Sequence, residues 1–292
     1  MKKGILLILL IFSTLSLFAQ VKGSEVYMFD LNVQKKGIQI KNPINISNHS
    51  GYDNQPFIDK TNNCIYYTSL SNDGTTNFMK YDLVDKGTDT FINSTASLYS
   101  ATLTPDAKFI SCIYTPDTNT QYLAKYSLDT KEPIFLIKDL VIGYHVWVNN
   151  HALLLFVLGK ENSLHYYDLI TKKDTILSKN IGRSLHKIPG KNACSYVQYT
   201  SDKERNLMML DLATMKSSVL IKLFEEHEDV TWSTDGMLFT NDGKDLYFSK
   251  PFKLNTWEKV ELHTDGIKLE GITRMQIDPD RKFIVLVASE TN

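Results

Sequence analysis

The histidines of this chain are the residues best suited to hold a metal ion. His145, His186 and His227 stand near the predicted starts of short strands, whereas His151 and His165 fall at turn and strand positions that offer no shared site. Three imidazoles that converge on one point can bind a divalent cation, which then acts as a Lewis acid. The three occupy different offsets in the repeat described below, so convergence does not follow from spacing. We expect no cofactor, with a divalent metal as the alternative.

Acid–base chemistry would need two carboxylates that face one substrate, and Glu228 and Asp229 are the candidates. We place both in a strand lead-in, where neighbouring side chains point to opposite faces, so we expect them not to share a substrate. Two short motifs are incomplete: GRSLH (182–186) lacks the second glycine of a nucleophile elbow, and HEDVT (227–231) is not H-E-x-x-H. The sequence therefore predicts no catalytic residue.

These side chains must be positioned by strands, because a strand-sized pattern returns along the chain. An aromatic or apolar residue followed by Asp-Leu, or a variant of it, occurs in MFDL, KYDL, KYSL, YYDL and MLDL, at residues 30, 82, 127, 168 and 211. The intervals of 52, 45, 41 and 43 residues suit the four-stranded blades of a β-propeller. No helical period of 3.6 residues competes with this pattern.

The repeats predict five complete blades, at roughly 47–94, 95–140, 141–181, 182–224 and 225–263. Two fragments remain. The C-terminal segment EGITRMQIDPDRKFIVLVASE supplies the first two strands of a blade, and the N-terminal segment SEVYMFDLNVQKKGIQIK supplies the last two. Joined, they close the ring and remove its free sheet edges. We therefore predict an all-β, six-bladed β-propeller closed by N-terminal strands that complete the C-terminal blade.

The first strand of each blade lines the channel of a propeller, so the residues that lead into these strands form its mouth. Aligning the repeats places a polar ring of mixed charge there, which is the predicted ligand site. Its members are Asn54, Gln55, Tyr99, Tyr144, His145, Glu228, Asp229 and Arg274, and a shift of one residue in the fourth blade adds His186.

Composition narrows the class of partner. The 32 Lys and Arg residues, less Lys2 and Lys3 of the predicted leader, leave 30 against 33 Asp and Glu, a net charge of −3. Such a surface has no general attraction for nucleic acid. Cys64, Cys112 and Cys194 are odd in number and widely spaced, so we expect small buried residues rather than disulfides.

The N-terminus predicts export. Lys2 and Lys3 precede an apolar run from Ile5 to Phe12, and Ala19 suits a cleavage site, so residues 1–19 are predicted to be a signal peptide. Residues 20–292 then form a single domain with no later membrane-spanning stretch. We expect a monomer in the periplasm or secreted from a Gram-negative cell.

Several segments resemble the WD-like repeats of TolB-type six-bladed propellers. They are YDNQPFIDKTNNCIYYTSLSNDGTTNFMKYDL, TLTPDAKFI and QIDPDRKFIVLVASE. The third and fourth blades depart from the family's Pro-Asp-Gly turn, with VNNHA and IPGKN. The resemblance implies a fold used mainly for binding, although some propellers are enzymes, and propeller lyases hold a divalent metal with several channel histidines.

Two interpretations follow. In the first, the chain is a non-enzymatic binding or scaffold module that holds an envelope protein or a small polar or saccharide ligand at the funnel. In the second, it is a metal-assisted lyase or hydrolase that uses His145, His186, Asp229 and Arg274 at the channel mouth.

Overall fold

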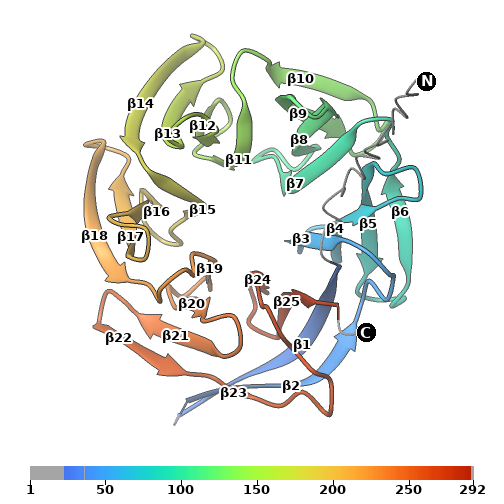
Figure 1. The fold of residues 1–292 in the computed structure, drawn as a ribbon, viewed down its shortest axis with the longest axis vertical. Coiled ribbons are helices and arrows are strands. Elements are labelled where there is room, and N and C mark those ends of the chain that lie inside the picture. The colour runs from blue at the N-terminus through green and yellow to red at the C-terminus, as the bar shows by residue number, and fades with distance from the viewer. Residues whose placement is uncertain (1–22, 36, 291–292) are drawn as a thin grey trace, which may run out of the picture.

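The structure is a computed structural model that describes residues 23–35 and 37–290. These residues form strands and turns with no helix, and therefore no helix that could cross a bilayer. Their strands gather into six sheets around a central axis (Figure 1). The predicted all-β, six-bladed β-propeller is confirmed. The predicted signal peptide, residues 1–19, lies outside the described residues.

Five blades are antiparallel sheets of four consecutive strands. Blade 1 consists of β3 (Asp53–Asp59), β4 (Cys64–Leu70), β5 (Thr76–Asp82) and β6 (Thr88–Ile92), and blade 2 of β7 (Ser97–Leu103), β8 (Phe109–Asp117), β9 (Thr120–Ser127) and β10 (Pro133–Ile137). Blade 3 consists of β11 (Ile142–Trp147), β12 (Ala152–Val157), β13 (Ser163–Asp168) and β14 (Lys173–Lys179), and blade 4 of β15 (Ile181–Lys187), β16 (Ala193–Tyr199), β17 (Arg205–Asp211) and β18 (Lys216–Lys222). Blade 5 consists of β19 (Val230–Trp232), β20 (Leu238–Asn241), β21 (Leu246–Lys250) and β22 (Leu254–Lys259).

Blade 6 is built from both ends of the described chain. Its strand order is β24 (Arg274–Ile277), β25 (Phe283–Ser289), β1 (Ser24–Gln34) and β2 (Gly37–Asn45), and β23 (Glu261–Leu262) adds a short parallel strand beside β2. β1 pairs antiparallel with β25 from Ser24 opposite Ser289 to Asp30 opposite Phe283. The predicted ring closure is therefore confirmed. One detail was wrong: β23, predicted within the fifth blade, belongs to the sixth.

The recurring Asp-Leu step has a local structural cause. In blades 1, 3 and 4, Oδ1 of Asp82, Asp168 and Asp211 accepts hydrogen bonds from the backbone N–H groups two and three residues further on. In blade 2, the hydroxyl of Ser127 accepts bonds from the same two positions. Asp and Ser both form such side-chain turns, which is why Ser substitutes for Asp in KYSL. In blades 1 to 4 the repeat therefore marks the turn that ends the third strand, whereas Asp30 lies inside β1.

Apolar side chains fill the space between blades, and two tryptophans add polar ties. Nε1 of Trp147 in blade 3 donates a hydrogen bond to Oγ of Ser111 in blade 2 at 2.8 Å. Trp232 in blade 5 makes the equivalent bond to Ser195 in blade 4 at 2.9 Å. The three cysteines are buried and unpaired, as predicted. The packed ring holds its first strands around the channel as a rigid frame.

Candidate functional site

A cavity of about 340 Å³ lies in the channel at the centre of the ring. Its walls come mainly from the first strands of the blades, which surround the axis (Figure 1). Six of the nine predicted site residues line it: Gln55, Tyr144, His145, His186, Asp229 and Arg274. The structure thus brings most of the predicted ring together in one place.

Three predicted residues do not line the cavity. Asn54 is buried at the junction with β1, where its Nδ2 donates to Oγ of Ser24 at 3.4 Å. Tyr99 packs against an apolar cluster between blades. Glu228 lies behind the wall and contacts the cavity residue Arg183. The first two each directly precede a β-bulge residue, Gln55 or Ser100, that does face the channel.

One network of polar contacts crosses the channel and takes a residue from each of the six blades of the described chain. We call these residues the collar, and they are Gln55, Ser100, Tyr144, Arg183, Asp229 and Arg274. Arg274 donates from Nη1 to Oδ1 of Asp229 at 2.5 Å and from Nη2 to the hydroxyl of Tyr144 at 2.8 Å. Gln55 donates to the same hydroxyl at 3.4 Å and accepts the backbone N–H of Ser100 at 2.6 Å.

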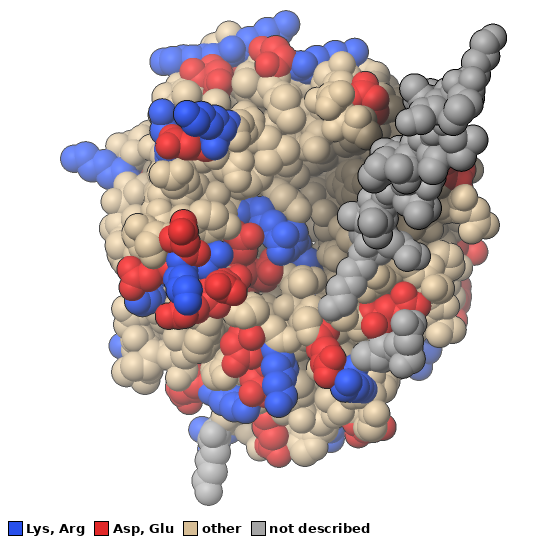
Figure 2. Space-filling view, viewed as in Figure 1, with Lys and Arg blue, Asp and Glu red and all other residues tan. Residues whose placement is uncertain are grey.

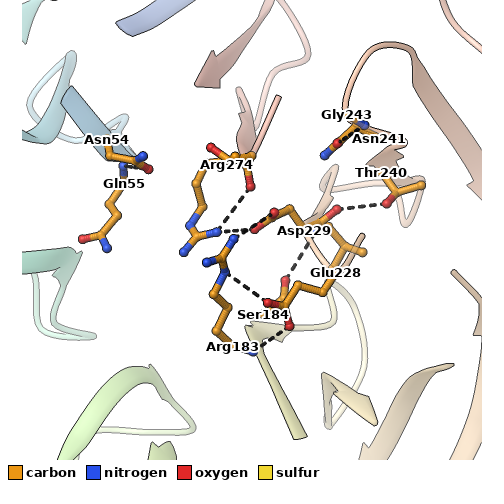
Figure 3. Close-up of polar contacts among 12 residues, drawn as sticks. Asn54, Gln55, Arg183, Ser184, Glu228, Asp229, Thr240, Asn241, Gly243 and Arg274 are labelled. Carbon is orange, nitrogen blue, oxygen red and sulfur yellow. Dashed lines mark hydrogen bonds and ion pairs between the residues drawn. The ribbon is translucent and has the colours of Figure 1, made fainter. Parts of the chain in front are cut away.

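Arg183 joins the collar through both neighbouring acids. Its Nη2 lies 3.4 Å from Oδ2 of Asp229, and its Nε lies 3.2 Å from Oε1 of Glu228 (Figure 3). The expectation that Glu228 and Asp229 do not share a substrate holds, because Asp229 lines the cavity and Glu228 does not, but strand alternation is not the reason. Both residues precede β19, which begins at Val230, so they do not follow strand alternation. Basic and acidic side chains accordingly lie together beside the central hollow (Figure 2).

Glu228 is held in place by a tight local fit. Its Oε2 accepts the hydroxyl of Tyr199 at 2.6 Å and the backbone N–H of Arg183 at 3.0 Å. A Cβ on Gly182 would lie 2.0 Å from that oxygen, so only glycine leaves room for the carboxylate. Position 182 thus fixes the direction from which Glu228 approaches Arg183.

Local backbone geometry turns Gln55 and Ser100 into the collar. Both have positive φ, +55° and +57°, and both lie at register shifts in β3 and β7. Such a β-bulge bends the strand and redirects a side chain. Gln55 thereby reaches across the channel toward Tyr144.

The two cavity histidines are neutral groups. Burial lowers the pKa of His145 to about 3. Burial also lowers the pKa of His186 to about 4; the charge of Asp229 opposes this shift and the charge of Arg274 adds to it. Nε2 of His145 lies 2.7 Å from Oγ of Ser111, and its buried Nδ1 has no hydrogen-bond partner among the described residues. Neither imidazole carries charge at pH 7, so the positive charge of the cavity comes from other residues.

The three candidate metal ligands are not brought together. His145 and His186 line the cavity, whereas His227 lies outside it, beside Gly243. Residues 23–35 and 37–290 contain no group of three His, Cys, Asp or Glu side chains placed to hold a metal ion. The described residues therefore do not fit the histidine metal site that the resemblance implied.

Sequence reasoning missed Arg183 as a site residue. β15 carries two extra residues between Ile181 and Leu185 relative to its partner β16, whereas β3 and β7 each carry one. The alignment of the repeats therefore left Arg183 out of the predicted ring. The available signal was the charge itself, an arginine within the first strand of a blade.

No family model and no curated protein matches the sequence. Solved structures match its fold. A putative TolB from Agrobacterium tumefaciens aligns with TM-score 0.68 and 9% identity over 93% of this chain and 99% of that one. TolB from Acinetobacter baumannii aligns with TM-score 0.59 and 14% identity over 92% of this chain, which spans 64% of that protein. An oligogalacturonate lyase in complex with manganese aligns with TM-score 0.58 and 14% identity over 87% of this chain and 82% of that one.

These structural alignments establish the fold. At identities this low, they do not show that this chain shares a substrate or partner with those proteins. The ring of six blades, its closure by the N-terminal strands and these alignments together identify the fold: the chain is a TolB-like six-bladed β-propeller.

Proposed function

We propose that the chain is an exported, non-enzymatic binding module that holds a small polar ligand in its central cavity. The observation that carries this proposal is the collar, in which six separate blades direct hydrogen-bonding and charged groups at one cavity. The volume of about 340 Å³ falls in the range of small-molecule sites.

A protein partner that docks over the channel mouth would contact the same collar. It is the other class of partner for a fold used for binding, and the experiment below separates it from a small ligand. The surface gives no support to nucleic acid as a partner, because acidic residues slightly outnumber basic ones.

The enzyme alternative has one observation in its favour. His145, His186, Asp229 and Arg274 all line the cavity, and a manganese-bound lyase shares the fold. Against it, Nε2 of each imidazole lies near a serine hydroxyl, and Asp229 is shared between two guanidinium groups. The two imidazoles and Asp229 thus already have partners within the protein, so we favour binding over catalysis.

The test is a thermal-shift screen of neutral and charged sugars, amino acids and short peptides. Thr102→Trp, which places a large side chain in the cavity, is the blocked variant. We expect at least one compound to raise the melting temperature of the wild type by several degrees and to leave Thr102→Trp unchanged. A screen without stabilising compounds, combined with a protein captured equally by both forms, would overturn the small-ligand proposal.

Export is tested separately. N-terminal sequencing of protein released from the periplasm is expected to begin at Gln20, after loss of residues 1–19. An uncleaved chain that stays in the cytoplasm would contradict the exported part of the proposal and leave the cavity unaffected.

A further inference from the structure

The cavity wall changes in character along the channel. The charged and hydrogen-bonding collar stands where the first strands begin, and apolar side chains follow it along the same strands, interspersed with His145, His186 and Lys187. The apolar side chains are Phe57, Val146, Leu185, Trp232, Met275 and Ile277, all of which line the cavity. A ligand that fills this space therefore meets the collar at one end and a wall with large apolar side chains beyond it.

The charged groups of the cavity are mainly cationic. Among the residues that the structure describes, the basic side chains that line it are Arg183, Lys187 and Arg274, and the one acidic side chain is Asp229. Glu228 offsets part of the charge of Arg183 from behind the wall. The cavity itself thus favours a negatively charged group.

The two arginines retain hydrogen-bond donors. A guanidinium has five N–H groups in a planar fork. Among residues 23–35 and 37–290, Nη1 of Arg183 has no hydrogen-bond or ion-pair partner, and the side chain is 36% exposed. Nη1 of Arg274 donates to Asp229 and to the backbone carbonyl of Thr273, and its Nη2 donates one hydrogen bond to Tyr144. Donors therefore remain on both groups.

The placement of the arginines suits an anion. Figure 3 shows the two guanidinium groups next to Asp229, with Gln55 across the channel from them. Like charges this close are stabilised by anions, and Asp229 supplies one. A carboxylate can bind an arginine fork through both oxygens, which gives it both affinity and a fixed orientation.

We propose that the cavity ligand is a small amphiphilic carboxylate, whose anionic group lies against Arg183 and Arg274 and whose compact apolar body lies against Val146, Leu185 and Trp232. This inference rests on the proposed function, because it names the chemistry of the ligand of the same cavity. It excludes long chains, since the cavity holds about 340 Å³.

The test uses three matched probes in NMR titrations of the full mature chain. Cyclohexanecarboxylate carries both the charge and the apolar body, cyclohexanecarboxamide lacks the charge, and acetate lacks the body. The indole N–H resonance of Trp232, assigned with Trp232→Phe, reports from the cavity wall. We expect cyclohexanecarboxylate to shift this resonance with a dissociation constant at least tenfold lower than that of either other probe.

Arg183→Gln is expected to weaken cyclohexanecarboxylate binding at least tenfold. Arg281→Gln is the matched control, because Arg281 pairs with Asp235 outside the cavity, and it is expected to bind as the wild type does. Should Arg183→Gln fail to fold, Arg183→Lys replaces it, with an expected loss of several-fold. In either case, the comparison of the three probes on the wild type decides whether the cavity prefers an amphiphilic carboxylate.

Each contrary outcome has a distinct meaning. Equal binding of the carboxylate and the carboxamide, or equal binding by wild type and Arg183→Gln, would overturn the anionic ligand. Equal binding of acetate and cyclohexanecarboxylate would overturn the apolar body. If all three probes leave Trp232 unchanged while a neutral sugar from the screen binds wild type and not Thr102→Trp, this inference fails and the proposed function stands.

Discussion

Arg274 of blade 6 and Asp229 of blade 5 meet at the channel, with 2.5 Å between Nη1 and Oδ1. Their side chains are 17% and 11% exposed, so each charge depends on the other for compensation. Removing one partner of a buried ion pair leaves the other uncompensated and is strongly destabilising. In the collar, Asp229 also pairs with Arg183, so its removal would leave two guanidinium groups with less compensation.

Asp229→Asn is therefore expected to lower the free energy of unfolding by on the order of 3 kcal/mol, measured by urea denaturation. The matched control is Asp235→Asn, since Asp235 forms an exposed pair with Arg281 at 2.7 Å. Exposed pairs contribute about 0–1 kcal/mol, so this variant should unfold close to the wild type. Equal changes in the free energy of unfolding for the two substitutions would show that the collar pair stabilises the fold no more than an exposed pair does.

A second buried acid predicts an unusual dependence of stability on pH. Asp53 begins the first strand of blade 1 and is fully buried; among the described residues neither carboxylate oxygen accepts a hydrogen bond, and Nδ1 of the half-exposed His49 lies 3.7 Å from Oδ2. Burial raises its pKa to about 6, against the opposing effects of Ser69 and His49, and Glu25 adds to the increase. The folded state therefore binds this proton more tightly than the unfolded state, whose pKa is near 3.8.

The contribution of Asp53 to stability is accordingly full below pH 3.8 and is lost as the pH rises to about 6. A difference of about two pKa units corresponds to about 3 kcal/mol. We expect Asp53→Asn to be more stable than the wild type at pH 7.5 and to lose that advantage near pH 4. Urea unfolding of both forms across this range measures the difference, and a constant difference would contradict the prediction.

How much of this could be predicted from sequence depends on what each residue does. The blades were predictable because Asp82, Asp168 and Asp211 form the same turn, a local event that leaves a repeated sequence mark. Ring closure followed from two complementary fragments. The collar was predicted only in part, because bulges shift the first strands by different numbers of residues, and sequence spacing does not reveal a bulge.

Arg183 and Glu228 illustrate that limit. The extra residues in β15 moved Arg183 into the channel, and an irregular lead-in freed Glu228 and Asp229 from strand alternation. Both effects depend on backbone geometry that several residues set together. The fold therefore follows from local sequence signals, whereas the site depends on small departures of the backbone from regular strand geometry.

Gly182 offers a test of how Glu228 is positioned. In Gly182→Ala, the new Cβ would meet Oε2 of Glu228 at 2.0 Å and push the carboxylate from Tyr199 and Arg183. We expect a loss of about 1–3 kcal/mol, the cost of buried hydrogen bonds left unmade. Gly87→Ala is the control, since no atom of another described residue lies within 4 Å of its Cβ position. Thermal unfolding in which both variants match the wild type would show that Glu228 moves without cost.

Ring closure can be tested by removing it. Deletion of residues 24–42 takes away β1 and part of β2 and exposes the edge of β25. An open edge is a template for pairing with another chain, so we expect loss of stability together with oligomers in size-exclusion chromatography. A truncated protein as stable and monomeric as the parent would contradict the role of β1 in closing the ring.

The central claim is that the collar is a binding site, and a crystal structure of the protein with the tightest ligand from the screen tests it most directly. We predict ligand atoms within hydrogen-bond distance of Arg183 and Arg274, inside the channel cavity. A ligand seated elsewhere, such as the groove lined by Lys191 and Phe252 between blades 4 and 5, with the collar contacts unchanged, would contradict it.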